Sequence, residues 1–175
     1  MKIAILGAPG TGKTQLAHAL TLHFLYPAAL ANDLNWVIAD APPLMAAVYA
    51  DLVFNDFTFY DLALAQHQLF NLTLVLGLDL PNPLECLAST QKLSRDAVDA
   101  RLRSVLAHHK LPYKVIYGLG ADRLEAALNA IAPLREERLK SNHNELGRWQ
   151  SRCEKCSDPV CEHRLFTGQL KIGSR

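Results

Sequence analysis

One stretch of eight residues constrains this chain more than any other. Residues 7–14 read Gly-Ala-Pro-Gly-Thr-Gly-Lys-Thr and fit the pattern G-x-x-x-x-G-K-[ST] at every fixed position. Glycines at these places let backbone N–H groups curl around a chain of phosphates without side-chain clashes. Such a loop connects a strand to a helix, so the motif predicts an α/β fold from its first residues onward.

The same eight residues predict a site for a nucleoside triphosphate with magnesium. The expected binding residues are Gly7, Ala8, Pro9, Gly10, Thr11, Gly12, Lys13 and Thr14. Lys13 is expected to reach the β- and γ-phosphates, and the Thr14 hydroxyl to bind Mg²⁺. The guanine-reading motif Asn-Lys-x-Asp does not occur in the sequence, which favours ATP over GTP. The alternative is a glycine-rich turn that binds nothing.

Apolar, strand-like segments alternate with helical patterns up to residue 132. Strands are expected at 2–6, 36–40, 72–78 and 113–117, and helices at 14–24, in part of 44–65, at 94–109 and at 121–132. Uninterrupted apolar strands between helices indicate a parallel sheet covered on both faces. The predicted fold is therefore a three-layer α/β sandwich of the P-loop NTPase type with a small, mostly parallel sheet.

Further candidate site residues follow the expected strands, because ligands of parallel sheets bind beyond the carboxyl ends of the strands. Asp40 closes the second strand, where a carboxylate can hold Mg²⁺ or take a proton from an acceptor hydroxyl. A turn-capping role is its structural alternative, and Asp79 fits an ordinary turn equally well. Gly118 and Arg123 follow the fourth strand. Arg123 either borders a base pocket or only decorates the start of a helix.

Positive charge over the migrating group is a further requirement of phosphoryl transfer. Three arginines lie in the helix expected after the third strand: Arg95, Arg101 and Arg103. Arg95, Asp99 and Arg103 are spaced i, i+4, i+8, which is typical of ion pairs on an exposed helix face. Arg101 has no partner in that series. Arg101 is therefore the predicted catalytic arginine, beside Lys13.

The order of these segments resembles a known kinase family. The resemblance is carried by Gly7–Thr14, Val37–Asp40, Asn71–Leu76, Asp79–Pro81, Gly118 and Arg123. They follow one another as in the nicotinamide riboside kinase domains of the bacterial bifunctional NAD-biosynthesis regulator. Residues 1–132 are more broadly similar to P-loop nucleoside and nucleotide kinases. The resemblance implies an ATP-dependent kinase with a small nucleoside-like acceptor, in which Asp40 lies near the acceptor hydroxyl and acts in catalysis.

The sequence departs from that family where the acceptor would bind. Asp40 is followed by Ala41-Pro42-Pro43 instead of a second aspartate, and Asn82 stands at the family's tryptophan position. Only about a dozen residues separate Phe24 from Trp36, where the family has a further strand and helix. Three functions therefore stay open: a small-molecule kinase, an ATP-driven switch or regulatory ATPase, and a nucleotide- and zinc-binding accessory module without turnover.

Residues 133–175 form a separate tail in which the strand and helix pattern stops. The tail carries nine Lys/Arg and six Asp/Glu residues, so it is basic. It also contains four candidate zinc ligands: Cys153, Cys156, Cys161 and His163. A Cys-x2-Cys pair is the usual first half of a zinc site. Free thiols on a polar tail are the alternative, since disulfides are unlikely in a reducing compartment.

Composition narrows the classes of partner. The 175 residues include 18 Lys/Arg and 17 Asp/Glu without a strong basic block, which disfavours nucleic-acid binding. No apolar run is long enough to cross a membrane, and no signal-peptide pattern precedes the first expected strand. The expected location is cytoplasmic. The expected partners are a nucleoside triphosphate and, for the kinase, a small-molecule acceptor; the oligomeric state is not indicated.

Overall fold

The computed structural model describes residues 1–28, 36–81 and 94–146. The predicted zinc ligands Cys153, Cys156, Cys161 and His163 therefore lie outside the described residues. Contacts divide the chain into two compact units, Met1–Ile131 and Ala132–Arg175. All the described strands and the 7–14 loop belong to the first unit.

Strands and helices alternate along the first unit. In chain order the elements are β1 (Lys2–Leu6), α1 (Lys13–Ala28), β2 (Val37–Asp40), α2 (Pro43–Phe54), α3 (Tyr60–His67), β3 (Leu72–Leu76), α4 (Arg95–His108), β4 (Lys114–Ile116) and α5 (Gly120–Leu146). Each predicted strand is present. The segment 44–65 forms two helices, because Asn55 adopts a left-handed φ of 53° and ends α2.

The described strands form one four-stranded sheet in which every pair is parallel. Their order is β2-β1-β3-β4, which confirms the predicted α/β class and the parallel sheet. On its two sides, Ile5 of β1 pairs with Asp40 and with Leu74. After β1 the chain first forms β2 on one side of it and later β3 on the other side. Gly7 leaves the sheet at this switch point, where open parallel sheets bind ligands.

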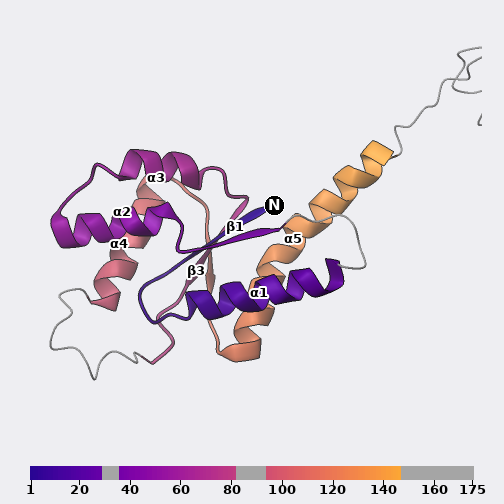
Figure 1. The fold of residues 1–175 in the computed structure, drawn as a ribbon, viewed down its shortest axis with the longest axis horizontal. Coiled ribbons are helices and arrows are strands. Elements are labelled where there is room, and N and C mark those ends of the chain that lie inside the picture. Colours follow the sequence, from indigo (N-terminus) through magenta and orange to yellow (C-terminus); the bar gives the residue numbers. More distant parts are fainter. Residues whose placement is uncertain (29–35, 82–93, 147–175) are drawn as a thin grey trace, which may run out of the picture. The chain divides into compact units, whose positions relative to one another are not determined.

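Helices cover both faces of the sheet, giving three layers (Figure 1). Side chains along a strand alternate between the two faces. Ile5 and Leu74 pack against α1 and the first turns of α5. Leu6 and Val75 pack on the opposite face, against α2, α3 and α4. The predicted covering of both faces is therefore present.

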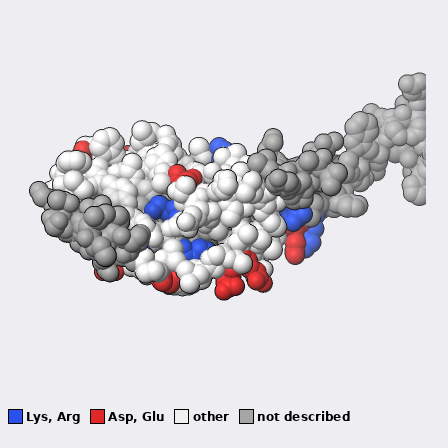
Figure 2. Space-filling model, turned by 60° about the horizontal axis from the view of Figure 1, so that its bottom comes forward, with Lys and Arg blue, Asp and Glu red and all other residues white. Residues whose placement is uncertain are grey.

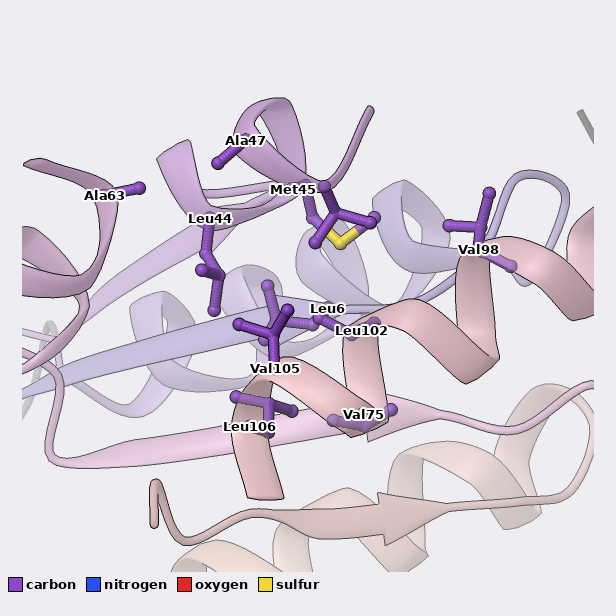
Figure 3. Packing of buried hydrophobic residues seen from close by; sticks show 12 residues of the cluster. Leu6, Leu44, Met45, Ala47, Ala63, Val75, Val98, Leu102, Val105 and Leu106 are labelled. Atoms are coloured by element: carbon purple, nitrogen blue, oxygen red, sulfur yellow. The ribbon is translucent and has the colours of Figure 1, made fainter. Parts of the chain in front are cut away.

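The layer formed by α2, α3 and α4 packs closely on β1 and β3 (Figure 3). Leu44 and Met45 of α2, and Leu102 and Leu106 of α4, are at most 1% exposed. Burying one such side chain contributes about 1.5–3 kcal/mol. These side chains surround Leu6, the last residue of β1. The core therefore fixes the point from which the 7–14 loop departs.

Helix α5 is longer than the sequence pattern predicts. It continues past residue 132 and through Pro133 to Leu146. Proline has no N–H, so the carbonyl of Asn129 loses its helical hydrogen bond at this point. The residues that follow, such as Arg135 and Glu136, are good helix formers and favour continuation. The apolar periodicity ends at residue 132, but the helix does not.

Charged side chains are scattered over the face that Figure 2 shows. Lys and Arg atoms form separate small areas within a mostly uncharged surface, and most carboxylates lie along the lower rim. None of the described helices has both the length and the apolar character needed to cross a membrane.

Candidate functional site

The 7–14 loop joins the end of β1 to the start of α1 through glycines in unusual conformations. The φ angles of Gly7, Gly10 and Gly12 are 152°, 72° and 78°. L-residues with a side chain rarely adopt such values. A Cβ atom on Gly7 would also lie 2.9 Å from the hydroxyl oxygen of Thr11 and 3.2 Å from Cβ of Leu76. The loop can therefore lie against the end of β3 only with glycine at position 7.

Two side chains of the loop hold its turn closed. The buried Thr11 hydroxyl donates a hydrogen bond of 2.8 Å to the carbonyl of Ala8. The Nζ atom of Lys13 donates to the same carbonyl, also at 2.8 Å. Pro9 is half-buried, and Gly10 is exposed at the crest of the turn. The loop thus keeps its shape through bonds to its own backbone.

Lys13 lies in a partly buried position between charges of both signs. Burial lowers the pKa of its ammonium group below the ordinary value of 10.5. The charge of Asp40 raises this pKa, and the charge of Arg95 lowers it again. The effect of burial on the pKa is larger than that of Asp40, so the charged form of Lys13 is disfavoured overall. An additional anion near Lys13 would stabilise this charged form.

Thr14 and Asp40 meet at the start of α1. The Thr14 hydroxyl donates to Oδ2 of Asp40 at 2.6 Å. The two residues are brought together because β2 pairs with β1, with Asp40 opposite Ile5. Both side chains are exposed and offer oxygen atoms, the ligand type that Mg²⁺ prefers. The two predicted magnesium ligands therefore lie next to each other.

A hollow of about 510 Å³ lies over the loop, within the usual size of small-molecule sites. Its described lining consists of Gly10, Gly12, Lys13, Thr14, Gln15, Leu80 and Pro81. Helix α1 begins at Lys13, so the N–H groups of its first turn lack helical partners and carry partial positive charge. The hollow is therefore suited to an anion.

Arg123 and Asp79 form a connected pair with the loop and with the end of β4. Arg123 is only 5% exposed, so it does not decorate the surface of α5, which was one of the two alternatives from the sequence. Its Nη1 donates to the carbonyl of Thr11 at 2.5 Å, and its Nη2 lies 2.7 Å from Oδ1 of Asp79. Oδ2 of Asp79 accepts the N–H of Gly118 at 2.6 Å. Whether Gly118 and Arg123 contribute to a base pocket stays a prediction.

Arg101, the predicted catalytic arginine, is engaged by a partner from another helix. Its Nε lies 2.9 Å from Oδ2 of Asp51, and its Nη2 donates to Oδ1 at 3.1 Å. Arg101 and Asp51 line a different hollow, of about 430 Å³, together with Tyr60 of α3. Within the described part of the chain, Arg101 is not among the residues that line the hollow over the loop.

Arg95 is one of the three arginines named from the sequence, but it was set aside there in favour of Arg101. The spacing with Asp99 and Arg103 predicts an exposed ion-pair series, but only Arg103 and Asp99 pair, at 2.7 Å. Nη1 of Arg95 instead donates to the carbonyl of Leu80 at 2.9 Å, and Leu80 lines the hollow over the loop. The signal that could have revealed it is position, since Arg95 is the first residue of α4.

Part of the Arg95 guanidinium has no partner in the described part of the chain. Its Nε and Nη2 are buried and make no hydrogen bond to any of the described residues. Its charge is also near enough to lower the pKa of Lys13. Lys13 therefore lines the hollow, and Arg95 contacts Leu80, another residue of its lining.

Comparison with known proteins found neither a matching family model nor a curated protein of significant similarity. The resemblance to nicotinamide riboside kinase domains accordingly stays a prediction. Among the described residues, no group of three or more His, Cys, Asp or Glu side chains is arranged to hold a metal ion.

Proposed function

We propose that this chain binds ATP with magnesium at the 7–14 loop and transfers the γ-phosphoryl group to a small nucleoside-like acceptor. One observation carries the proposal: Lys13 and the Thr14–Asp40 pair lie together at the glycine loop that opens α1. The loop, the cation and the oxygen pair are among the parts that phosphoryl transfer requires. We also propose that the three-layer sandwich is of the P-loop NTPase type and that the chain is related to P-loop kinases.

The residues present fit a magnesium ion. Thr14 and Asp40 place two oxygen atoms 2.6 Å apart on adjacent elements. Mg²⁺ is typically held by one or two such protein groups, while waters and substrate phosphates complete its shell. When bound, the ion supplies positive charge that neutralises the phosphate oxygens.

The chain's own residues supply charge and a proton acceptor for the transfer. The oxygen of the acceptor hydroxyl bonds to the γ-phosphorus, the bond to the β–γ bridging oxygen breaks, and ADP leaves. Lys13 and the start of α1 stabilise the charge on the phosphates. Asp40 receives the hydroxyl proton. We assign the arginine role to Arg95 in place of Arg101, because Arg95 bonds to Leu80 of the hollow and its charge acts on Lys13, whereas Arg101 is paired with Asp51.

An ATP-driven switch with slow hydrolysis is the second candidate function. It is favoured by the hydrogen bond that Asp40 already makes. Its carboxylate already accepts the hydroxyl of the proposed magnesium ligand Thr14. Two other carboxylates of the first unit are engaged through both oxygens: Asp51 with Arg101, and Asp79 with Arg123 and Gly118. If Asp40 binds only the metal ion, none of these three carboxylates is left to take the proton of an acceptor hydroxyl. The site would then favour slow hydrolysis over transfer to an acceptor.

The test is release of ADP from magnesium-ATP, with and without a panel of nucleosides that includes nicotinamide riboside. A kinase releases ADP only with one acceptor, whereas a switch releases it slowly and without any. Lys13→Ala should abolish nucleotide binding, because it removes the only cation of the loop itself. Retained ATP affinity in that variant would overturn the proposal.

Two further variants separate the catalytic roles. Asp40→Asn should abolish acceptor-dependent turnover and leave most of the ATP affinity. Arg95→Gln should lower turnover by roughly 100- to 1000-fold, the usual effect of losing one preorganised donor. The matched control is Arg103→Gln on the same helix, whose partner is Asp99. Equal turnover in the two arginine variants would remove Arg95 from the mechanism.

A further inference from the structure

Arg123 places a buried positive charge against the backbone of the 7–14 loop. The residue belongs to the first turn of α5, and its side chain reaches the Thr11 carbonyl across 112 positions of sequence. It is not among the described residues that line the hollow over the loop. Asp79 balances the charge from the other end of the guanidinium, at 2.7 Å. Arg123 therefore acts on the loop itself.

The carbonyl that Arg123 binds shares a peptide unit with the N–H of Gly12. This unit is trans, since no peptide bond within the described ranges is cis, so its C=O and N–H point in opposite directions. The Gly12 N–H therefore points away from Arg123, and Gly12 lines the hollow. A hydrogen bond to the oxygen of a peptide group polarises it and strengthens its N–H as a donor.

The contact is specific for an arginine held in one orientation. One nitrogen of the guanidinium serves Thr11 and another serves Asp79, and Asp79 in turn accepts the N–H of Gly118. The planar fork of arginine can make two such bonds at fixed directions, whereas the ammonium of lysine is a point charge. A Cβ atom on Gly12 would lie 3.2 Å from Nη1 of Arg123, so the absence of a side chain there also matters.

We infer that Arg123 is a positioning residue that sets the affinity of the loop for phosphate through the Thr11–Gly12 peptide. Asp79 holds the guanidinium in place and connects it to the turn after β4. The inference rests on the proposed function, because it specifies how the same loop binds the phosphates of a nucleotide. It assigns Arg123 a role through the backbone, without contact to the base.

The experiment measures the dissociation constants of inorganic tripolyphosphate and ADP, each with Mg²⁺, by calorimetry on the full chain. Arg123→Ala should weaken both ligands by roughly 10- to 100-fold, the range expected for one charged hydrogen bond. Arg123→Gln, which can keep a neutral donor to the carbonyl, should fall between that variant and the original chain. Arg123→Lys should also bind more weakly than the original chain, since lysine cannot reproduce the fork.

Adding guanidinium to the Arg123→Ala variant tests whether Arg123 positions the loop or only stabilises the fold. Millimolar guanidinium should restore tripolyphosphate affinity to Arg123→Ala, while equal concentrations of methylammonium or sodium should not. Lys13→Ala, which loses a different cation, should gain nothing from guanidinium. Circular dichroism confirms that each variant compared is folded. If Arg123→Ala does not fold, the dissociation constants of Arg123→Gln and Arg123→Lys are compared with those of the original chain. Unchanged affinity in both variants would then overturn the role of Arg123.

The measurements separate a failure of the proposed ATP site from a failure of the role of Arg123. If the original chain binds neither tripolyphosphate nor ATP, the proposed function fails and the inference fails with it. If the original chain binds both and the folded Arg123 variants bind equally well, only the role of Arg123 is overturned. Weakened binding in Arg123→Ala that guanidinium does not relieve would also overturn it, in favour of a brace of the fold.

Discussion

His67 is a buried imidazole at the end of α3, only 3% exposed. Its Nε2 lies 2.9 Å from the hydroxyl oxygen of Thr73, and its Nδ1 is buried with no partner among the residues that the structure describes. Burial lowers the pKa of His67 below the ordinary value of 6.5. The folded state therefore binds this proton less readily than the unfolded chain does.

This difference predicts how stability depends on pH. The contribution of His67 to the free energy of unfolding is fully present above pH 6.5 and declines as the pH falls from 6.5 toward the lowered pKa. Urea unfolding between pH 7.5 and 5 should show this decline, and His67→Gln should reduce it. His18→Gln, which changes an exposed histidine of α1, is the control and should leave the decline unchanged. An identical decline in His67→Gln would contradict the assignment.

At this scale the sequence predicts backbone roles better than side-chain partners. Lys13 and the loop glycines were predictable because the motif fixes their identity and their local geometry together. The pairs Arg101–Asp51 and Arg123–Asp79 were not, because their members are 50 and 44 positions apart. Helical spacing reveals only pairs within one helix, such as Arg103 with Asp99.

Three helices of one layer meet at the carboxylate of Asp51. Asp51 belongs to α2, its side chain is 2% exposed, and its Oδ2 accepts the Tyr60 hydroxyl of α3 at 2.7 Å. Arg101 of α4 contributes the two bonds described above. Burial, together with Asp51, raises the pKa of the Tyr60 phenol, so the hydroxyl stays protonated as the donor. One carboxylate therefore joins α4 to two consecutive helices that come before it in the sequence, with Asp51 lying 50 positions before Arg101.

Arg101→Met tests whether Arg101 is structural. The substitution leaves the buried carboxylate of Asp51 with Tyr60 as its one partner among the described residues, which should lower the free energy of unfolding by about 1–3 kcal/mol. Nucleotide affinity, measured by calorimetry, should not change. Arg103→Met is the matched control, since it removes an ion pair within α4 worth about 0.3–0.5 kcal/mol. A stable Arg101→Met protein that has lost turnover would restore Arg101 to the catalytic group.

Element boundaries show where the sequence pattern was sufficient. The strands were predictable because each is a short apolar run that ends at Gly, Asp or Pro. The division of 44–65 was not, because it depends on the left-handed backbone of Asn55. The extension of α5 was not either, since Pro133 and the loss of apolar periodicity both suggest an end.

For the whole molecule, the 7–14 loop links parts of the first unit that are distant in sequence. It follows β1, lies against Leu76 at the end of β3, and is bound by Arg123 of α5. A ligand that holds this loop should therefore stabilise the first unit as a whole. At a concentration 100 times its dissociation constant, a non-hydrolysable ATP analogue with Mg²⁺ should raise the free energy of unfolding by about 2.7 kcal/mol.

A thermal melt followed by circular dichroism measures this effect. Lys13→Ala should show no shift at the same ligand concentration, whereas Lys2→Ala, an exposed lysine of β1, should respond like the original chain. A shift of equal size in Lys13→Ala would mean that the analogue binds elsewhere.

The central place of β1 has a consequence for how the chain reaches its fold during synthesis. Ile3 pairs with Ile38 on one side and with Leu72 on the other, so both partners are made after it. At ordinary translation rates, the ribosome needs on the order of 3 to 14 seconds to proceed from Ile3 to Leu72. During that interval an apolar strand has an open edge and no second neighbour. The nascent chain is therefore exposed to aggregation until β3 emerges, and a chaperone that shields the strand during this time should increase the yield of folded protein.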